Sequence, residues 1–243
     1  MKYIASFSGG KDSTAMVLQI IEEKLPLDEI VMFDTGWEFP QMYEHIAKFE
    51  AFTGRTVTIL KPKRSFRYWM FERPVIAQKG AMKGKVHRIG NGWPNWGWRW
   101  CTGIKRDTMN SHCKNAIQYV GFAKDEKERA AVNGVKRGVQ QIYPLIEWGM
   151  TETECLTYCR IRGFDWGGLY KYFNRVSCFC CPLKGLSDLR KLRRHFPVLW
   201  SKMLAWDAEL GCGNRGFRGY DTVADLEFRF AKEDRQPNFH LYE

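Results

Sequence analysis

The sequence lacks any apolar run near the roughly 18 residues that a membrane-spanning helix needs, so we expect no membrane contact. It also lacks repeats, low-complexity tracts and linkers rich in glycine, serine and proline, so its composition marks no firm domain boundary. The first residues show no apolar stretch or cleavage site typical of a secretory signal, which favours a cytosolic protein. In that reducing compartment, the eight cysteines are interpreted as buried thiols, metal ligands or redox groups rather than structural disulfides.

Acidic residues are also in short supply. Lys and Arg number 38 and Asp and Glu number 27, so the formal net charge is +11 and the surface attracts polyanions such as nucleic acid or free nucleotides. The chain has 243 residues, 44% of them hydrophobic, which is enough to bury a sizeable core and excludes both disorder and a disulfide-stapled mini-protein. This length favours one large domain, or one domain with a small annex.

Strand and helix patterns alternate over the first 60 residues. Short apolar runs predict strands, and amphipathic runs that end near Pro26 or Gly54 predict helices. In chain order these are a strand at 2–7, a helix over 15–21, a strand at 29–33, a helix over 41–53 and a strand at 56–60. The alternation predicts an α/β fold, in which a parallel twisted sheet carries helices on both faces.

The remaining chain is less regular. Residues 61–100 mix basic and aromatic residues with glycines, and predict a long excursion over the carboxyl edge of the sheet. Beyond it we expect a strand at 116–122, a short edge strand at 143–145, a helix from the capping box Thr151/Glu154 to Arg162, a basic helix over 187–210, and a polar, poorly patterned C-terminal stretch. The expected organisation is an α/β domain at 1–150 with a mostly helical, cysteine-containing annex at 151–243, or one continuous domain.

The strongest single motif lies between the first strand and the first helix. Here Ser8, Gly9, Gly10, Lys11, Asp12 and Ser13 follow one another. Two glycines allow a tight turn with inward N–H groups, and the helix N-terminus adds partial positive charge, so the motif predicts a phosphate or pyrophosphate site. An ordinary glycine turn with an Asp or Ser cap is the alternative. The motif is neither a Walker loop nor a Gly-x-Gly-x-x-Gly fingerprint.

This loop resembles that of the PP-loop ATP pyrophosphatases, in the branch that holds the phosphoadenosine-phosphosulfate (PAPS) reductases and the DndC-like sulfur-transfer enzymes. The segment with Asp34, Thr35 and Gly36 is similar to a family segment near the adenine nucleotide, and Arg129 ends a segment similar to one that contacts phosphate or sulfate. The resemblance implies an adenine nucleotide alpha hydrolase-like fold, with a PP-loop nucleotide-binding domain at 1–150. It also implies ATP or PAPS as the nucleotide, with Mg²⁺ where ATP is used.

Cys178 and Cys181 form a Cys-x-x-Cys pair, which can place two thiolates on one metal ion or cluster. A redox pair is the alternative, although no thioredoxin-like unit surrounds it. By resemblance to cluster-bearing sulfonucleotide reductases, Cys101, Cys178 and Cys181 are expected metal ligands. Cys180 and Cys159 are the candidates for a fourth ligand, and an exogenous ligand on an open iron is also compatible. The resemblance favours a [4Fe–4S] cluster, with zinc as the alternative.

The C-terminal end departs from the PAPS reductases. Those enzymes carry a nucleophilic cysteine in a Glu-Cys-Gly context, whereas this chain ends with residues 238–243, which contain no cysteine. Cys212 is the sole remnant-like candidate, in a different setting. This departure favours ATP-dependent activation and sulfur transfer over reduction of a sulfonucleotide.

Two further features point to nucleic acid. Trp93, Trp96, Trp98 and Trp100 could stack on bases, or could bury themselves within their own loop. Arg190, Lys191, Arg193, Arg194 and His195 form a basic patch that either contacts phosphates or is an ordinary solvated helix face.

Three functional hypotheses follow. The first is an enzyme that adenylylates an acceptor, releases pyrophosphate and transfers sulfur, with Lys11, Asp12 and Arg129 in catalytic roles and tRNA or DNA as a candidate acceptor. The second is a sulfonucleotide reductase. The third is a non-catalytic nucleotide- or nucleic-acid-binding component with a structural metal. A protein that donates sulfur or electrons is an expected partner of the first two.

Overall fold

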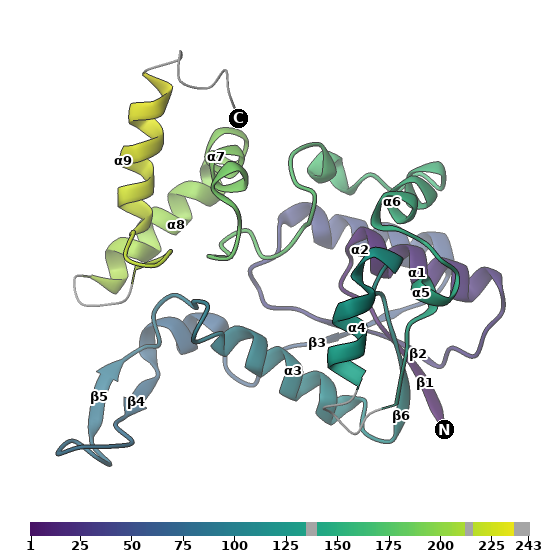
Figure 1. Ribbon diagram of the computed structural model, residues 1–243, viewed down its shortest axis with the longest axis horizontal. Helices are drawn as coiled ribbons and strands as arrows, with labels where there is room; N and C mark the ends of the chain where they lie inside the picture. Colours follow the sequence, from purple (N-terminus) through teal and green to yellow (C-terminus); the bar gives the residue numbers. More distant parts are fainter. Residues whose placement is uncertain (135–139, 212–215, 236–243) are drawn as a thin grey trace. The chain divides into compact units, whose positions relative to one another are not determined.

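The computed structural model describes residues 1–134, 140–211 and 216–235, and these form two compact units that we treat separately (Figure 1). The sheet unit comprises residues 1–62 and 104–178, and the helical unit comprises residues 63–103 and 179–243. These limits differ from the expected boundary at residue 150. The division into domains at 1–150 and 151–243 stays a prediction. Among the described helices, none is long and apolar enough to cross a membrane.

The sheet unit is built on a parallel sheet of five strands in the order β3-β2-β1-β6-β7. The strands are β1 (Lys2–Ser6), β2 (Glu29–Phe33), β3 (Val57–Leu60), β6 (Ala116–Val120) and β7 (Gln140–Ile142). Ser6 at the end of β1 lies opposite Val31 of β2 and Val120 of β6. The loops that follow these three strands therefore leave from the same edge of the sheet.

Helices cover this sheet, which confirms the expected α/β fold. They are α1 (Lys11–Glu22), α2 (Pro40–Thr53), residues 104–112 of α3 (Trp100–His112), α4 (Lys127–Gly134), α5 (Pro144–Glu147) and α6 (Glu152–Ile161), with 3₁₀ turns η2 (Lys124–Glu126) and η3 (Trp166–Lys171). The chain runs from β1 outward to β3 and then returns to β6 on the other side of β1. Right-handed crossovers therefore place α1 and α2 on one face of the sheet and α4 on the other. The strand order reverses between β1 and β6, the place where open α/β sheets bind ligands.

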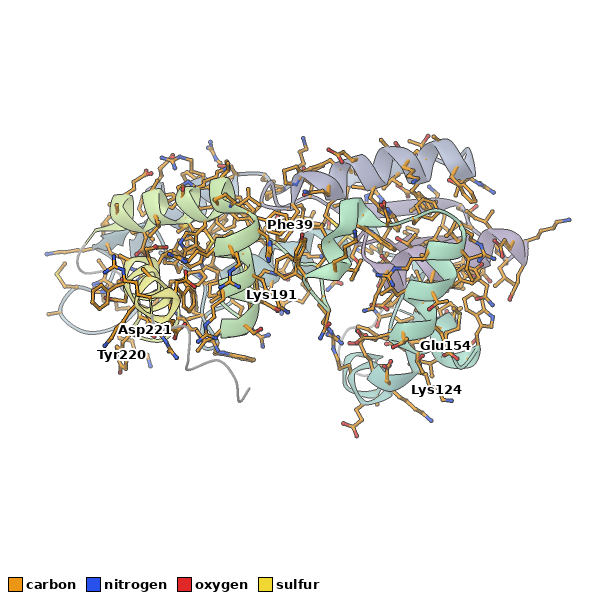
Figure 2. All side chains as sticks on the ribbon, turned by 90° about the horizontal axis from the view of Figure 1, so that it is seen from above. Phe39, Lys124, Glu154, Lys191, Tyr220 and Asp221 are labelled. Atoms are coloured by element: carbon orange, nitrogen blue, oxygen red, sulfur yellow. The ribbon has the colours of Figure 1, made fainter. Side chains whose placement is uncertain are left out.

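Burial follows from this arrangement. The central strands are apolar on both sides: Ile4 and Ala5 of β1 and Val31 and Met32 of β2 are at most 2% exposed. Helix α6 packs on α1 and begins with the expected capping box, in which the Thr151 amide donates to Glu154 Oε2 at 2.8 Å. Glu154 lies near Lys124 of the neighbouring turn (Figure 2).

In its described part, the helical unit contains a hairpin, a π-helix and the three C-terminal α-helices. The π-helix η1 (Tyr68–Glu72) leads into the antiparallel strands β4 (Pro74–Ile76) and β5 (Val86–Ile89), and the C-terminal half folds as α7 (Leu186–His195), α8 (Pro197–Leu210) and α9 (Val223–Asp234). Aromatic rings form its core: the Trp93 ring lies 4.9 Å from Phe217 and 6.2 Å from Trp206. The hairpin extends beyond the rest of this unit in Figure 1.

Three expectations for these elements were wrong. The edge strand expected at 143–145 is instead β7, which ends at Ile142, and Pro144 starts the short helix α5 because proline lacks an amide donor but fits a first helical turn. The helix expected over 187–210 is interrupted at Phe196, since Pro197 opens α8. The C-terminal stretch contains the well-formed helix α9, whose capping box joins Thr222 and Asp225.

Candidate functional site

The loop from Ser8 to Ser13 turns sharply between β1 and α1. Gly9 has a φ of +74°, a left-handed conformation that favours glycine, and Gly10 precedes the first helical residue. The Ser13 hydroxyl accepts from the Ser8 amide at 3.1 Å and donates to the Gly10 carbonyl at 3.1 Å. Ser13 therefore shapes the loop from inside and does not cap the helix.

Two aromatic side chains from η3 hold the loop from outside. Trp166 Nε1 donates to the Gly9 carbonyl at 2.6 Å, and the Tyr170 hydroxyl accepts from the Lys11 amide at 2.8 Å. The Lys11 amide belongs to the first turn of α1, where helix N–H groups have no partner within the helix. The Tyr170 oxygen thus occupies a position that an anion's oxygen would also favour.

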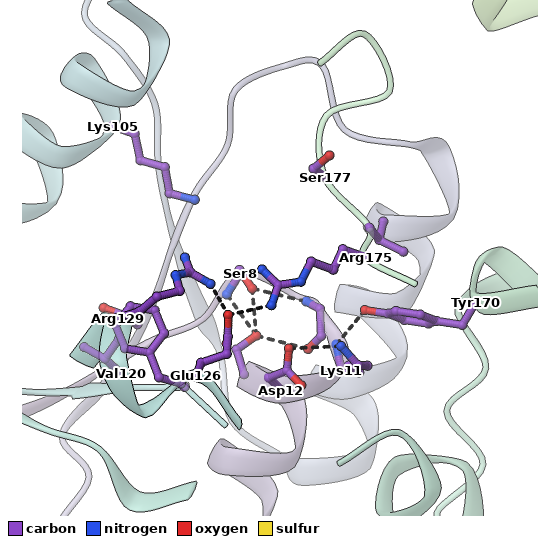
Figure 3. A pocket seen from close by; sticks show the side chains of 16 residues that line it. Ser8, Lys11, Asp12, Lys105, Val120, Glu126, Arg129, Tyr170, Arg175 and Ser177 are labelled. Atoms are coloured by element: carbon purple, nitrogen blue, oxygen red, sulfur yellow. Dashed lines mark hydrogen bonds and ion pairs between the residues drawn. The ribbon is translucent and has the colours of Figure 1, made fainter. Parts of the chain in front are cut away.

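A cavity of about 480 Å³ opens where the strand order reverses (Figure 3). One wall is the Ser8–Ser13 loop and another is the segment that follows β6, where Gly121 comes so close to Ser13 that a Cβ would lie 3.1 Å from its Cα. Four cationic side chains line the cavity, namely Lys11, Lys105, Arg129 and Arg175. The cavity therefore combines a glycine loop, a helix N-terminus and positive charge, which suits a polyphosphate.

Three of these cations are tied to carboxylates within the unit. Lys11 Nζ lies 2.6 Å from Glu152 Oε2 and 3.3 Å from Asp12 Oδ2. Arg175 pairs with Glu152 and, at 2.6 Å, with Glu126, which also pairs with Arg129. Through Glu152 and Glu126 the pairs form one series of alternating charges, of which Figure 3 shows the pairs Lys11–Asp12, Glu126–Arg175 and Glu126–Arg129. Among the described residues, Lys105 forms no ion pair within 4.0 Å, although its charge acts on the Glu38 carboxylate.

Asp12 is the carboxylate whose titration is most affected. Burial is the largest cause and raises its pKa to about 6, against the opposing effect of Lys11. Its Oδ1 atom is buried and has no hydrogen-bond partner among the described residues. The ionised Asp12 carboxylate is therefore destabilised at neutral pH, and binding of a cation or a proton would stabilise it.

The Asp34–Gly36 segment follows β2 at the same edge of the sheet. Asp34 Oδ1 accepts from the Gly36 amide at 2.7 Å and from the Tyr43 hydroxyl at 2.8 Å, so this carboxylate stabilises the turn. None of Asp34, Thr35 and Gly36 is among the residues that line the cavity. Their predicted contact with a nucleotide stays a prediction.

Cys178 belongs to the sheet unit and lies beside that same segment. Its Sγ is 3.3 Å from Thr35 Oγ1 and 3.6 Å from Glu38 Oε1, and burial raises the pKa of Glu38. Cys101 and Cys181 belong to the helical unit and are close enough to interact electrostatically, while burial raises the pKa of Cys101. Among the described residues, no group of three or more potential ligands is arranged to hold a metal ion.

The other cysteines are mostly buried. Cys180 is 2% exposed, and Cys159 in α6 donates from its thiol to the Lys11 carbonyl at 3.5 Å behind the loop. Burial raises the pKa of Cys155, on the preceding turn of α6, to about 12. Cys212 and the chain end at 238–243 lie outside the described residues.

The residues predicted to contact nucleic acid differ in their exposure and in their partners. Trp93 and Trp100 are 1% and 7% exposed and anchor their loop, whereas Trp96 and Trp98 are 75% and 49% exposed. The basic patch on α7 faces α9: Arg190 pairs with Glu233, Arg193 with Glu227 and Asp234, and Arg194 with Asp234. Much of this patch is therefore a charged contact between two helices.

Sequence reasoning missed four residues of the cavity region: Lys105, Glu152, Tyr170 and Arg175. Glu152 and Tyr170 lie 141 and 159 positions from Lys11, so no local spacing joins them to the loop. Glu152 follows a recognisable capping threonine, but that signal predicts a helix start and says nothing of an ion pair.

Comparisons with known proteins complete the description. The profile described as the phosphoadenosine phosphosulfate reductase domain matches residues 2–184. The chain is 26% and 23% identical, over 212 and 211 residues, to two uncharacterised proteins of Methanocaldococcus jannaschii. These alignments cover 82% and 81% of this chain but 40% and 45% of those proteins, so the chain spans less than half of their length.

Two solved structures are also similar. One is the U34-tRNA thiolase NcsA of Methanococcus maripaludis with its [4Fe-4S] cluster, at 18% identity and a TM-score of 0.44, over 100% of this chain and 82% of that one. The other, from Methanocaldococcus jannaschii, is described as a predicted subunit of tRNA methyltransferase, at 13% identity and a TM-score of 0.34, over 81% of this chain and 89% of that one.

Proposed function

The chain belongs to the phosphoadenosine phosphosulfate reductase domain family, and from this premise we propose that the cavity beside the Ser8–Ser13 loop binds the phosphate groups of an adenine nucleotide. The observation that carries the proposal is the convergence of the loop, the N-terminus of α1 and four cationic side chains on one cavity at the reversal of strand order. Its volume of about 480 Å³ is in the range of small-molecule sites.

The reaction that we propose uses ATP. An acceptor oxygen attacks the α-phosphorus, the bond to the bridging oxygen breaks, and pyrophosphate leaves; a sulfur nucleophile then displaces AMP from the activated acceptor. In this proposal Lys11, Arg175 and Lys105, which line the cavity together with Arg129, stabilise the charge that develops on the leaving pyrophosphate. The acceptor that we propose is a nucleic acid, tRNA or DNA, in keeping with the net charge of +11.

Mg²⁺ fits this site. Asp12 Oδ1 is buried without a hydrogen-bond partner among the described residues, and carboxylate oxygens suit this cation. Bound with ATP, Mg²⁺ would neutralise the departing pyrophosphate. Asp12 is the residue that would hold this ion.

The metal ligands that we propose are Cys101, Cys178 and Cys181. Cys101 and Cys181 interact in the helical unit, and Cys178 belongs to the sheet unit. A [4Fe–4S] cluster is the group that we propose for these three, with Cys180 or Cys159 as a fourth ligand and zinc as the alternative. Anaerobic iron, sulfide and zinc analysis of the protein distinguishes a [4Fe–4S] cluster from zinc. The same analysis of the Cys181→Ser variant tests whether this thiolate is a ligand, in which case the metal content falls.

A nucleotide titration tests the central proposal. ATP affinity is measured by calorimetry for the native chain, for Lys11→Ala and Arg175→Ala, and for Lys24→Ala, which removes an exposed lysine at the far end of α1. We expect a loss of about tenfold or more for the two cavity variants, because each removes a hydrogen bond to charged phosphate, and no change for the control. Unchanged affinity in both folded cavity variants contradicts the proposal. Sulfite release from PAPS with a thiol donor, without pyrophosphate release from ATP, favours the reductase alternative.

A further inference from the structure

One basic segment of the chain, most of it in the helical unit, is free of acidic residues. Between Glu72 and Asp107 the sequence contains no Asp or Glu, while it carries Arg73, Lys79, Lys83, Lys85, Arg88, Arg99, Lys105 and Arg106. The part of this segment that forms the hairpin β4–β5 and the turn at residues 95–99 is named the basic arm. All of it lies within the helical unit.

The tip of the arm presents three lysines to solvent. Lys79, Lys83 and Lys85 are exposed, and no carboxylate among the described residues pairs with them. Backbone hydrogen bonds order this tip: the Lys83 amide donates to Gly80 at 3.0 Å and the Lys85 amide donates to Met82 at 2.9 Å. The lysines therefore lie on a defined turn, and no carboxylate in the described part of the chain neutralises their charge.

The second part of the arm is an aromatic turn. The Asn95 side chain accepts from the amides of Gly97 and Trp98, each at 3.0 Å, and closes the turn. Trp96 is 75% exposed, with the Arg99 guanidinium 5.7 Å from its ring centroid. Trp96 and Trp98, two residues apart in this turn, together expose aromatic surface of the kind that binding sites present.

Buried neighbours hold this turn in place. Trp93 Nε1 donates to Asp207 at 2.9 Å, and Trp100 Nε1 donates to the Gly92 carbonyl at 3.2 Å. The segment is thus anchored at both ends while Trp96 and Trp98 project. The exposure of these two indoles is a feature of a fixed turn.

We propose that the basic arm binds an unpaired segment of a nucleic acid strand. Lysines without internal partners suit phosphates, whose neutralisation releases counterions, and indoles beside an arginine suit the faces of unpaired bases. Ile76, Val86 and Ile89 of the hairpin are also exposed, but an apolar partner alone leaves the one-signed charge unmatched. The proposal extends the proposed function by giving its acceptor a binding surface, yet it requires no nucleotide and no turnover.

The test measures binding of a labelled single-stranded 12-nucleotide RNA, and of the DNA of the same sequence, to the full chain without ATP at several salt concentrations. The variant K79A/K83A/K85A is compared with K24A/K114A/K127A, which removes three exposed lysines from the sheet unit and changes the net charge equally. We expect a loss of affinity of about tenfold or more for the arm variant and a salt dependence reduced by about two counterions, since each phosphate contact on a single strand contributes about 0.7. The control loses less than about threefold.

Trp96→Ala supplies the second readout. We expect it to weaken binding by about tenfold at every salt concentration, because base stacking does not depend on counterions. Equal losses in the two triple variants, or binding of anionic phospholipid vesicles without binding of either oligonucleotide, overturns the proposal. The affinity for ATP is measured in parallel for the native chain and for the arm variant. If ATP does not bind the native chain while the oligonucleotide results hold, the proposed function fails and this proposal stands.

Discussion

The cavity of the sheet unit and the basic arm of the helical unit are both rich in cations, but they treat those cations differently. In the cavity, Lys11, Arg129 and Arg175 each pair with a carboxylate of the protein. In the arm, the tip lysines have no such partner among the described residues. A ligand of the cavity must displace internal carboxylates, so it needs concentrated charge in a fixed geometry, whereas the arm suits an extended polyanion of any sequence.

Helix α7 shows that basic sequence alone does not distinguish these cases. Its arginines resemble the arm in composition, yet they pair with acids of α9. Charge runs therefore acquire a functional meaning only when the acids that could neutralise them are located in the fold. The predictions below change the pairing of one region at a time.

The largest expected effect comes from breaking a paired region. Glu227→Gln removes the carboxylate that accepts from Arg193 at 2.8 Å through two nitrogens and from Trp200 Nε1 at 2.6 Å. We expect a loss of about 2 kcal/mol in the free energy of unfolding, because hydrogen bonds to charged groups are lost and Arg193 stays partly buried. Urea denaturation measures it, with the exposed Glu23→Gln as the control. A change below about 0.5 kcal/mol contradicts the conclusion that ion pairs between α7 and α9 stabilise the fold.

The next largest effect is expected in the pH dependence of stability, and Asp12 is its cause. Its folded pKa of about 6 exceeds the unfolded value of 3.8, so ionised Asp12 destabilises the fold above pH 6, and this cost disappears as pH falls through 6 toward 4. Asp12→Asn should therefore be more stable than the native chain at pH 7 by about 1–2 kcal/mol, with the difference shrinking by pH 4.5. Thermal or urea unfolding at the two pH values checks this, and a difference that is constant or grows on acidification contradicts it.

A smaller effect is expected on ligand binding in the cavity. Glu152→Gln removes the negative charge that holds Lys11 at 2.6 Å and also pairs with Arg175. Because phosphate no longer competes with this carboxylate, we expect affinity for pyrophosphate to rise about threefold to tenfold. Calorimetry with pyrophosphate measures the change, and the conservative Glu152→Asp should fall between the two. An unchanged or lower affinity in a folded Glu152→Gln protein contradicts competition within the cavity.

The smallest effect is expected in the arm. Lys83→Ala removes an exposed cation with no carboxylate partner among the described residues, so the free energy of unfolding should change by less than about 0.5 kcal/mol. The same urea protocol as for Glu227→Gln makes the contrast direct. A loss of more than about 1 kcal/mol shows that this lysine has a structural role and removes the distinction between the regions.

Local signals in the sequence were enough for much of the sheet unit. The strand expected at 29–33 matches β2, and the capping box at Thr151 starts α6 as expected, because each depends on residues close together in the chain. The break at Pro197 and the Thr222/Asp225 capping box of α9 were equally local signals, and they were missed because basic and polar composition obscured them. Val223, Leu226 and Phe230 at helical spacing supply the buried face of α9.

The candidate site was predictable in its centre and not in its surroundings. Gly9 and Gly10 identified the loop: Gly9 has a left-handed φ of +74°, and a Cβ at Gly10 would lie 3.3 Å from the Tyr170 hydroxyl oxygen. Tyr170 and Glu152 join that loop only through the packing of η3 and α6, so their roles depend on the tertiary structure. Trp93 is buried and donates a hydrogen bond to Asp207 of α8, whereas Trp96 is exposed. This difference likewise depends on the tertiary structure.

A crystal structure of the chain with a non-hydrolysable ATP analogue tests the central claim most directly. We predict phosphate groups in the cavity, within hydrogen-bond distance of the Ser8–Ser13 loop and of at least one of Lys11, Lys105 and Arg175. An analogue bound elsewhere at full occupancy, with this cavity holding only solvent, contradicts the account.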